Sequence, residues 1–176
     1  ADTLERTDEI YLGYDMSSFD EQHHINDVSF NEGQLVVSMF SREGVWRKGV
    51  WNDGCLATVD VNAGQIDRVI QSGLKQPHSI LSTKDGYWFC NSMECSVWYG
   101  NEVMCETNGY LRGLAEDDDH LYIGQSTMRR LERFAKRFNN ISMNCGIHTW
   151  HKEKKTSSFI PLPAKSVFDI LVLDAE

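Results

Sequence analysis

The sequence predicts an all-β fold, a β-propeller of four-stranded antiparallel blades with about three blades in the chain. A strand–turn–strand phrase recurs along the sequence, with Val28, Ile80, Leu114 and Ile170 at equivalent positions. Its copies start units of about 35 to 55 residues, a period typical of propeller blades. Only residues 127–138 show apolar side chains at helical spacing. A β-sandwich is the rival fold, but it does not require an inner hairpin to recur with polar residues just before it.

The first unit supplies four predicted strands. Residues 25–40 form a hairpin closed by a glycine-containing turn at residues 31–33. A long loop follows at residues 41–53. Two further strands are predicted at residues 55–61 and 66–70, which gives the count of four strands per blade.

The later units repeat this order with insertions between the strands. In the second unit we expect strands at residues 80–82, 87–91, 97–99 and 103–106. In the third we expect strands at residues 114–115, 121–124, 146–150 and 158–160, with residues 125–144 as a loop and short helix inserted on the channel-mouth face. The last phrase, residues 167–173, is predicted to be a single strand.

Three four-stranded blades are too few to close a ring, because propellers have four blades or more. Exposed sheet edges also tend to pair with other chains. We therefore expect a homodimer that closes to about six blades. Within this arrangement, residues 9–14 are expected to be an outer strand that completes the blade begun by residues 167–173.

Length and composition set the broad class of protein. The 176 residues are 41% hydrophobic, which allows one domain over residues 1–176 with a sizeable core. No apolar run approaches the roughly 20 residues of a membrane span, and no signal-peptide core is present at the start, so we expect a soluble, cytoplasmic protein. The net charge of −9 opposes nucleic acid and anionic membranes as partners, because phosphate binding needs a basic surface. The five cysteines have irregular spacings and are expected to be reduced and mostly buried.

The polar residues that open each phrase carry a family resemblance. Residues 24–28, 76–79, 111–114 and 168–170, in this order, resemble an uncharacterised bacterial family, domain-of-unknown-function family 4915. The chain is about half the length expected of that family, which carries no function that could be transferred. More loosely, the order resembles six-bladed propellers of the gluconolactonase, strictosidine synthase and NHL-repeat kind. That resemblance implies a channel calcium site of Glu, Asn and Asp, which cannot be matched residue by residue here.

Propeller geometry predicts one candidate site. Inner strands line the channel, and the polar residues at their entries share a face with the loops between second and third strands, where long insertions often carry function. We therefore predict a polar pocket at the channel mouth for a small anionic or carbohydrate-like ligand. Its predicted ligand-binding residues are Asn26, Ser79, Arg112, Asn91, Glu94, Gln125, Arg129, Arg130 and Trp46.

Several of these residues also have a purely structural interpretation. Asp27 and Asp169 are candidates only to accept hydrogen bonds from neighbouring blades. Arg112 could hold an anion through its bidentate fork, or it could simply neutralise the two aspartates. The basic segment around Arg129 and Arg130 could draw in an anion, dock on an acidic partner, or only pack its apolar side on the blade.

Two further functions stay open on the sequence alone. A hydrolase or lactonase-like enzyme would use His24, His78, Asp27 and Asp169 as catalytic residues, with calcium or zinc as a possible helper. No cofactor is otherwise expected, and the common hydrolase, nucleotide and metalloprotease motifs are absent. The other alternative is a protein-interaction scaffold.

Overall fold

The computed structural model describes residues 23–129, 131–133 and 138–173. Within these residues, twelve strands form three four-stranded antiparallel sheets, each with its strands in sequence order. The first sheet contains β1 (Ile25–Asn31), β2 (Gln34–Met39), β3 (Gly54–Asp60) and β4 (Gln65–Leu74). The second contains β5 (Pro77–Ser82), β6 (Tyr87–Asn91), β7 (Ser96–Tyr99) and β8 (Glu102–Glu106). The third contains β9 (Tyr110–Glu116), β10 (His120–Ser126), β11 (Gly146–His151) and β12 (Ser157–Pro161).

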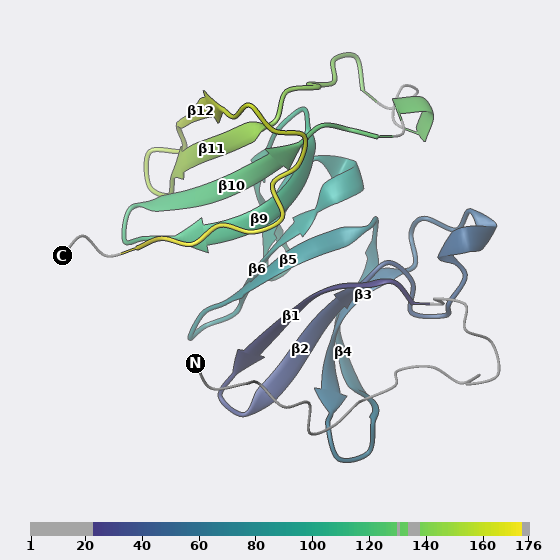
Figure 1. Ribbon diagram of the computed structural model, residues 1–176. Helices are drawn as coiled ribbons and strands as arrows, with labels where there is room; N and C mark the ends of the chain where they lie inside the picture. The colour runs from purple at the N-terminus through teal and green to yellow at the C-terminus, as the bar shows by residue number, and fades with distance from the viewer. Residues whose placement is uncertain (1–22, 130, 134–137, 174–176) are drawn as a thin grey trace, which may run out of the picture.

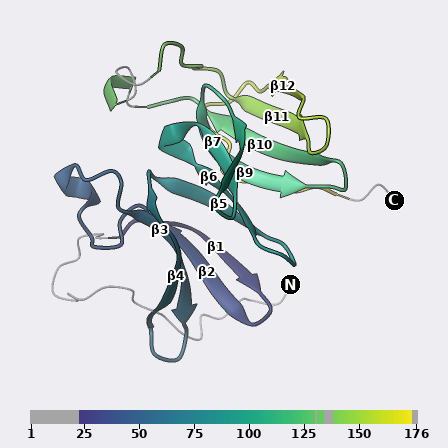
Figure 2. The same cartoon turned by 180° about the vertical axis from the view of Figure 1, so that it is seen from behind.

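The three sheets are arranged like successive propeller blades. The first strand of each sheet is the inner one, with β1 packed against β5 and β5 against β9. The sheets fan out from these inner strands, as Figure 1 and the reverse view in Figure 2 show. The predicted all-β class and the three four-stranded units are therefore confirmed.

In the middle sheet, β6 is buried on both faces, and its successive side chains point to opposite faces. On β6, Phe89 packs toward the first sheet, in a cluster with Val36. Its neighbour Trp88 packs toward the third sheet, in a cluster with Leu121 and Trp150. One strand, β6, therefore contributes apolar contacts to both neighbouring sheets.

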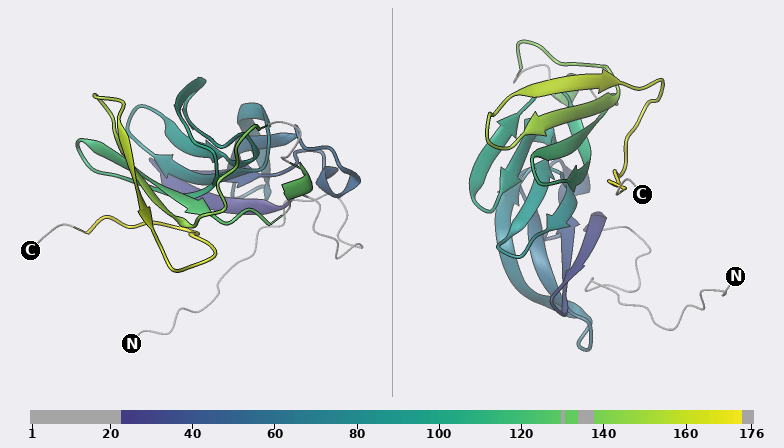
Figure 3. Two further views of the ribbon diagram at one scale, coloured as in Figure 1. Left: turned by 90° about the horizontal axis from the view of Figure 1, so that it is seen from above. Right: turned by 90° about the vertical axis from the view of Figure 1, so that its left-hand side faces the viewer.

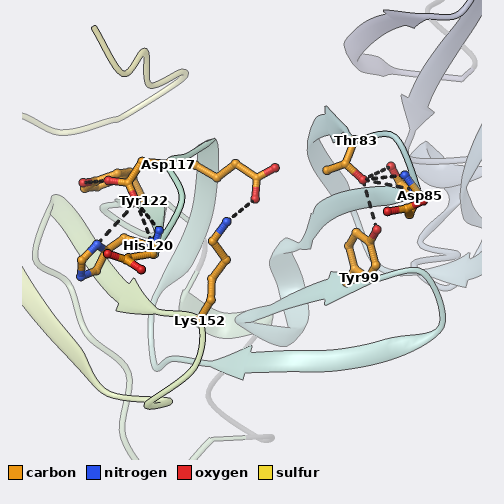
Figure 4. Close-up of polar contacts among 10 residues, drawn as sticks. Thr83, Asp85, Tyr99, Asp117, His120, Tyr122 and Lys152 are labelled. Carbon is orange, nitrogen blue, oxygen red and sulfur yellow. Dashed lines mark hydrogen bonds and ion pairs between the residues drawn. The ribbon is translucent and has the colours of Figure 1, made fainter. Parts of the chain in front are cut away.

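In two of the inner hairpins, the turn between the strands is held by hydrogen bonds that involve a tyrosine hydroxyl (Figure 4). In the β5–β6 turn, the Thr83 hydroxyl accepts the Gly86 backbone N–H at 3.1 Å and lies 3.1 Å from the Tyr99 hydroxyl. In the β9–β10 turn, the Tyr122 hydroxyl donates to Asp117 at 2.6 Å. These bonds fix the turns, and so the register of each inner hairpin.

Three expectations about secondary structure are wrong or fall outside the described residues. Residues 127–129 are not helical, and among the described residues of the insertion the helical ones are those of a short 3-10 helix, η3 (Leu131–Arg133), while residues 130 and 134–137 of the predicted helix lie outside the described residues. Residues 167–173 are not a strand, although they run beside β9 (Figure 3, with the view in Figure 1). The outer strand expected at residues 9–14 lies outside the described residues.

The start of this last segment is held by one side chain. The Ser126 hydroxyl accepts the Val167 backbone N–H and donates to the Val167 carbonyl, both at 3.0 Å. This side chain takes the two backbone groups that a sheet neighbour would pair. The segment therefore occupies the place of a fourth inner strand without belonging to a sheet.

The cysteines are placed as the sequence predicted. Cys55, Cys90, Cys95 and Cys145 are buried, and Cys105 is half-buried. Burial raises the pKa of the Cys105 thiol to about 11. At neutral pH the Cys105 thiol therefore stays protonated and is a poor nucleophile.

Candidate functional site

A hollow of about 260 Å³ lies where the inner strands begin, on the side of the molecule that carries the long loops. In Figure 1 these loops, residues 41–53 and the insertion after β10, both project to the right, opposite the hairpin turns. The hollow is lined by His24, Phe40, Trp46, Gln76, Tyr110, Arg112, Ser126, Thr127, Met128, Arg129 and Ser166. Of the predicted site residues, the structure thus brings together His24, Trp46, Arg112 and Arg129.

One repeat position supplies a lining residue from each phrase. His24, Gln76, Tyr110 and Ser166 all line the hollow, and each stands four residues before the aligned apolar position of its phrase. Sequence reasoning selected only His24 from this set. Continuing the repeat alignment a few residues upstream would have found the other three.

Arg112 enters the hollow from β9 between two aromatic rings. Its guanidinium carbon lies 5.5 Å from the centre of the Tyr110 ring and 4.9 Å from that of Phe168. Among the described residues, its Nε has no hydrogen-bond partner, and the ion pairs present involve other groups. The expected neutralisation of Asp27 and Asp169 by this arginine is therefore not made through a direct ion pair.

His78 lies beneath the hollow and is buried. Its Nδ1 lies 3.0 Å from the Gln76 carbonyl and 2.9 Å from the Ser92 hydroxyl, which itself donates to the Leu111 carbonyl at 2.7 Å. A carbonyl only accepts hydrogen bonds, so the proton belongs on Nδ1 and Nε2 is left as an acceptor. Burial, helped by the charge of Arg112, lowers the pKa of His78 to about 3. The ring is therefore neutral and a weak base.

Three of the predicted inner-strand residues connect neighbouring blades. Asp27 accepts the Val28 N–H at 2.8 Å and the Ile80 N–H at 2.7 Å. Asn26 donates to the Pro77 carbonyl at 3.3 Å. The bonds to Ile80 and Pro77 join side chains of β1 to the backbone of β5.

The next blade boundary uses the same position. Ser79, which is equivalent to Asp27, accepts the Gly113 N–H of β9 at 2.6 Å. Asp169, at the same position of the last phrase, is exposed and accepts only the N–H of its neighbour Ile170, at 2.8 Å, among the described residues. This position serves architecture in the first two blades.

The predicted loop residues mostly fix their own loops. The Asn91 side-chain oxygen accepts the Lys75 backbone N–H, and Glu94 pairs with the Lys75 ammonium, both at 2.8 Å. Gln125 is buried, and its amide donates to the Asn144 carbonyl at 2.8 Å, which ties down the end of the insertion. Arg130 lies outside the described residues.

The charge of the hollow is opposite to that of the chain. Two guanidinium groups, those of Arg112 and Arg129, are among the eleven lining residues, and none of those residues is a carboxylate. The chain as a whole carries a net charge of −9. The hollow is thus suited to an anion that would be repelled by much of the remaining surface.

A metal site is not assembled by the predicted residues. No three His, Cys, Asp or Glu side chains gather around a possible metal position in the described part of the chain. Both oxygens of Asp27 accept backbone N–H groups, which leaves this carboxylate committed to the blade contact. Nor does any helix within the described ranges have the length and apolarity needed to cross a bilayer.

The fold and the hollow define a propeller-like β protein with a small pocket at the entry of its inner strands. The chain belongs to the family described as domain of unknown function DUF4915, whose sequence profile matches residues 16–175. This match confirms the resemblance noted at the strand entries. No curated protein matches the chain.

Two solved structures of computationally designed proteins are similar in fold. The Ika4 protein is 13% identical, with a TM-score of 0.52, and the match covers 93% of this chain and 89% of that one. The Ika8 protein is 12% identical, with a TM-score of 0.48, and the match covers 85% of this chain and 40% of that one. At these identities the likeness concerns the fold alone.

Proposed function

We propose that this chain is a ligand-binding module whose channel-mouth pocket holds a small anionic or carbohydrate-like molecule. One observation carries the proposal: Arg112 and Arg129 line a hollow that contains no carboxylate, in a chain with a net charge of −9. Guanidinium groups bind carboxylates and phosphates through two parallel hydrogen bonds. The aromatic rings on either side of Arg112 hold this group in place for such a contact.

The test is titration calorimetry with small carboxylates, phosphate and sugar acids. Arg112→Gln and Arg129→Gln should each weaken binding of the anion by about tenfold or more, because a charged hydrogen bond contributes about 1.5–3 kcal/mol. Arg68→Gln is the matched control, because it removes the same charge from an exposed residue on the outer strand β4. Equal weakening by all three substitutions, or no binding of any anion, would refute the proposal.

Two observations weigh against the hydrolase alternative. Asp27 holds two backbone N–H groups, and His78, with a pKa of about 3, is a weak general base at neutral pH. Release of product from a lactone in the same titrations, lost in His78→Ala, would bring it back. The scaffold alternative predicts instead that Arg112→Gln changes nothing with small ligands.

We also propose that two copies of the chain associate. Large apolar side chains are exposed at both ends of the stack of sheets: Phe30 on β1 is 70% exposed, and Phe168 and Leu171 in the last segment are 66% and 79% exposed. We expect these side chains to be covered in the dimer, because large exposed apolar patches mark interaction sites. Light scattering should give twice the chain mass of 20.2 kDa, and a monomer at micromolar concentration would exclude this association.

A further inference from the structure

The walls of the pocket differ in chemistry from one blade to another. The first sheet and its loop contribute the aromatic cluster, which consists of His24, Phe40 and Trp46. The centre of the His24 ring lies 4.2 Å from that of Phe40 and 4.8 Å from that of Trp46. These rings form an apolar wall that offers flat surface to a ligand.

The third sheet and the segments beside it contribute the guanidinium pair, Arg112 and Arg129. Arg112 is clamped between the Tyr110 and Phe168 rings. Arg129 follows β10 and donates to the Ser166 hydroxyl at 3.3 Å. Both guanidinium groups of the pocket therefore come from the third sheet and the segments beside it, whereas the aromatic cluster comes from the first sheet and its loop.

A row of ring contacts links the two walls. Phe40 contacts the buried His78 ring at a centroid distance of 5.2 Å, and His78 contacts Tyr110 at 5.4 Å. Two ring-to-ring steps thus lead from the aromatic cluster to the ring beside Arg112. A ligand that contacts both walls has to bridge the space above this row.

The polar groups between the walls favour a ligand that accepts hydrogen bonds. Gln76 uses its side-chain oxygen to accept the Tyr110 hydroxyl at 3.0 Å, so its N–H groups are what the side chain can offer. Ser126 uses its hydroxyl on Val167. A volume of about 260 Å³ lies just below the roughly 300 Å³ at which drug-sized pockets begin, which suits a single ring better than a nucleotide.

We propose that the ligand is a small carboxylate that carries a flat ring, bound with the ring against the aromatic cluster and the carboxylate on the guanidinium pair. This inference rests on the proposed function and deepens it, because it requires two recognition elements at the same time. The ring supplies contact area, and the carboxylate supplies paired hydrogen bonds to a planar cation.

The test compares three matched probes by titration calorimetry: 3-phenylpropionate, propionate and 3-phenylpropanol. The first carries ring and carboxylate, and each of the others lacks one of them. We expect 3-phenylpropionate to bind at least about tenfold more tightly than either, with one site per chain. Trp46→Leu should reduce this advantage over propionate, and Arg112→Gln should reduce the advantage over the alcohol, with Arg68→Gln unchanged. Trp46→Phe keeps a ring, so it should retain most of the binding and separates loss of the ring from loss of folding.

The outcomes distinguish the two proposals. If propionate binds as tightly as 3-phenylpropionate and needs Arg112, the anion site stands and the ring-bearing ligand is refuted. If glucuronate or phenyl phosphate binds more tightly than 3-phenylpropionate, the carboxylate with a flat ring is also refuted. If no anion binds to the folded protein, both proposals fail.

Discussion

Asp27 joins the first two blades through a hydrogen bond, so replacing this residue measures how much the contact contributes to stability. Asp27→Ala removes the acceptor of two backbone N–H groups, those of Val28 and Ile80. Val28 is 55% exposed, so water replaces the lost bond there, whereas Ile80 is 8% exposed and its N–H is left without an acceptor. An unsatisfied buried donor costs about 1–3 kcal/mol, and removing a partly buried charge recovers some of this, so we expect a loss of about 1–2 kcal/mol in the free energy of unfolding.

Urea unfolding followed by tryptophan fluorescence measures this loss. Asp27→Asn keeps one side-chain oxygen for Ile80 and should lose less. Asp169→Ala is the matched control at the same repeat position, because this exposed residue accepts only the Ile170 N–H among the described residues, and its cost should stay within about 0.5 kcal/mol. An equal loss for the two alanine variants, or no loss for Asp27→Ala, would refute the assignment of Asp27 to the blade contact.

The pH dependence of this contact has a defined sign. Burial raises the pKa of Asp27 above its usual 3.8, although the N–H groups of Ile80 and Val28 act in the opposite direction. The folded protein therefore holds this proton more tightly than the unfolded chain does. Its contribution to stability is complete below pH 3.8 and is lost as the pH rises through the raised pKa, a dependence that Asp27→Asn should not show.

Three further substitutions test the turns, the core and the last segment. Tyr122→Phe should raise the pKa of Asp117, which the Tyr122 hydroxyl and then backbone N–H groups hold at about 2, so that less stability is lost as the pH falls below 3.8; an NMR titration of the carboxyl carbon measures the pKa, and an unmoved pKa would contradict this. Phe89→Ala, at a side chain 1% exposed in the middle sheet, should cost about 3–5 kcal/mol in urea unfolding, and a loss below about 1 kcal/mol would contradict the packing described. Ser126→Ala should speed hydrogen exchange at Val167 at least about tenfold while leaving exchange in the middle sheet unchanged, and unchanged exchange at Val167 would show that the hydroxyl is not what holds the segment.

Much of the strand order follows from local chemistry, which is why it could be predicted. The turn at residues 31–33 and the alternating residues on either side of it are realised as β1 and β2, paired from Ile25 with Met39 to Asn31 with Gln34. The segment at residues 167–173 has the same phrase, but no strand of the described residues pairs with it. Its secondary structure depends on a partner that the phrase itself does not encode.

The predicted helix shows a different limit. Apolar residues at helical spacing favoured a helix over residues 127–138, but Met128 and Phe138 instead belong to a cluster with Met93 and Cys95, near the loop after β6. Spacing alone does not show that the apolar side chains at the two ends of this segment pack against another blade.

The candidate site was predictable only where it follows the repeat. Arg112 and His24 were found because they stand at strand entries, whereas the row formed by Phe40, His78 and Tyr110 joins residues from three blades. Contacts of this kind depend on how the sheets stack, which no single stretch of sequence specifies. Asn91 and Gln125 were predicted as ligand-binding residues, but the structure uses their hydrogen bonds to hold loops.

In the first two units, the repeat separates two tasks near the start of the inner strand. The position shared by Asp27 and Ser79 attaches one blade to the next, and the position shared by His24, Gln76, Tyr110 and Ser166 faces the pocket. Between these two units both positions change, yet Asp27 and Ser79 each accept a backbone N–H of the following blade. Such a scaffold could change its ligand through one substitution per blade, without changing the contacts that hold the blades together.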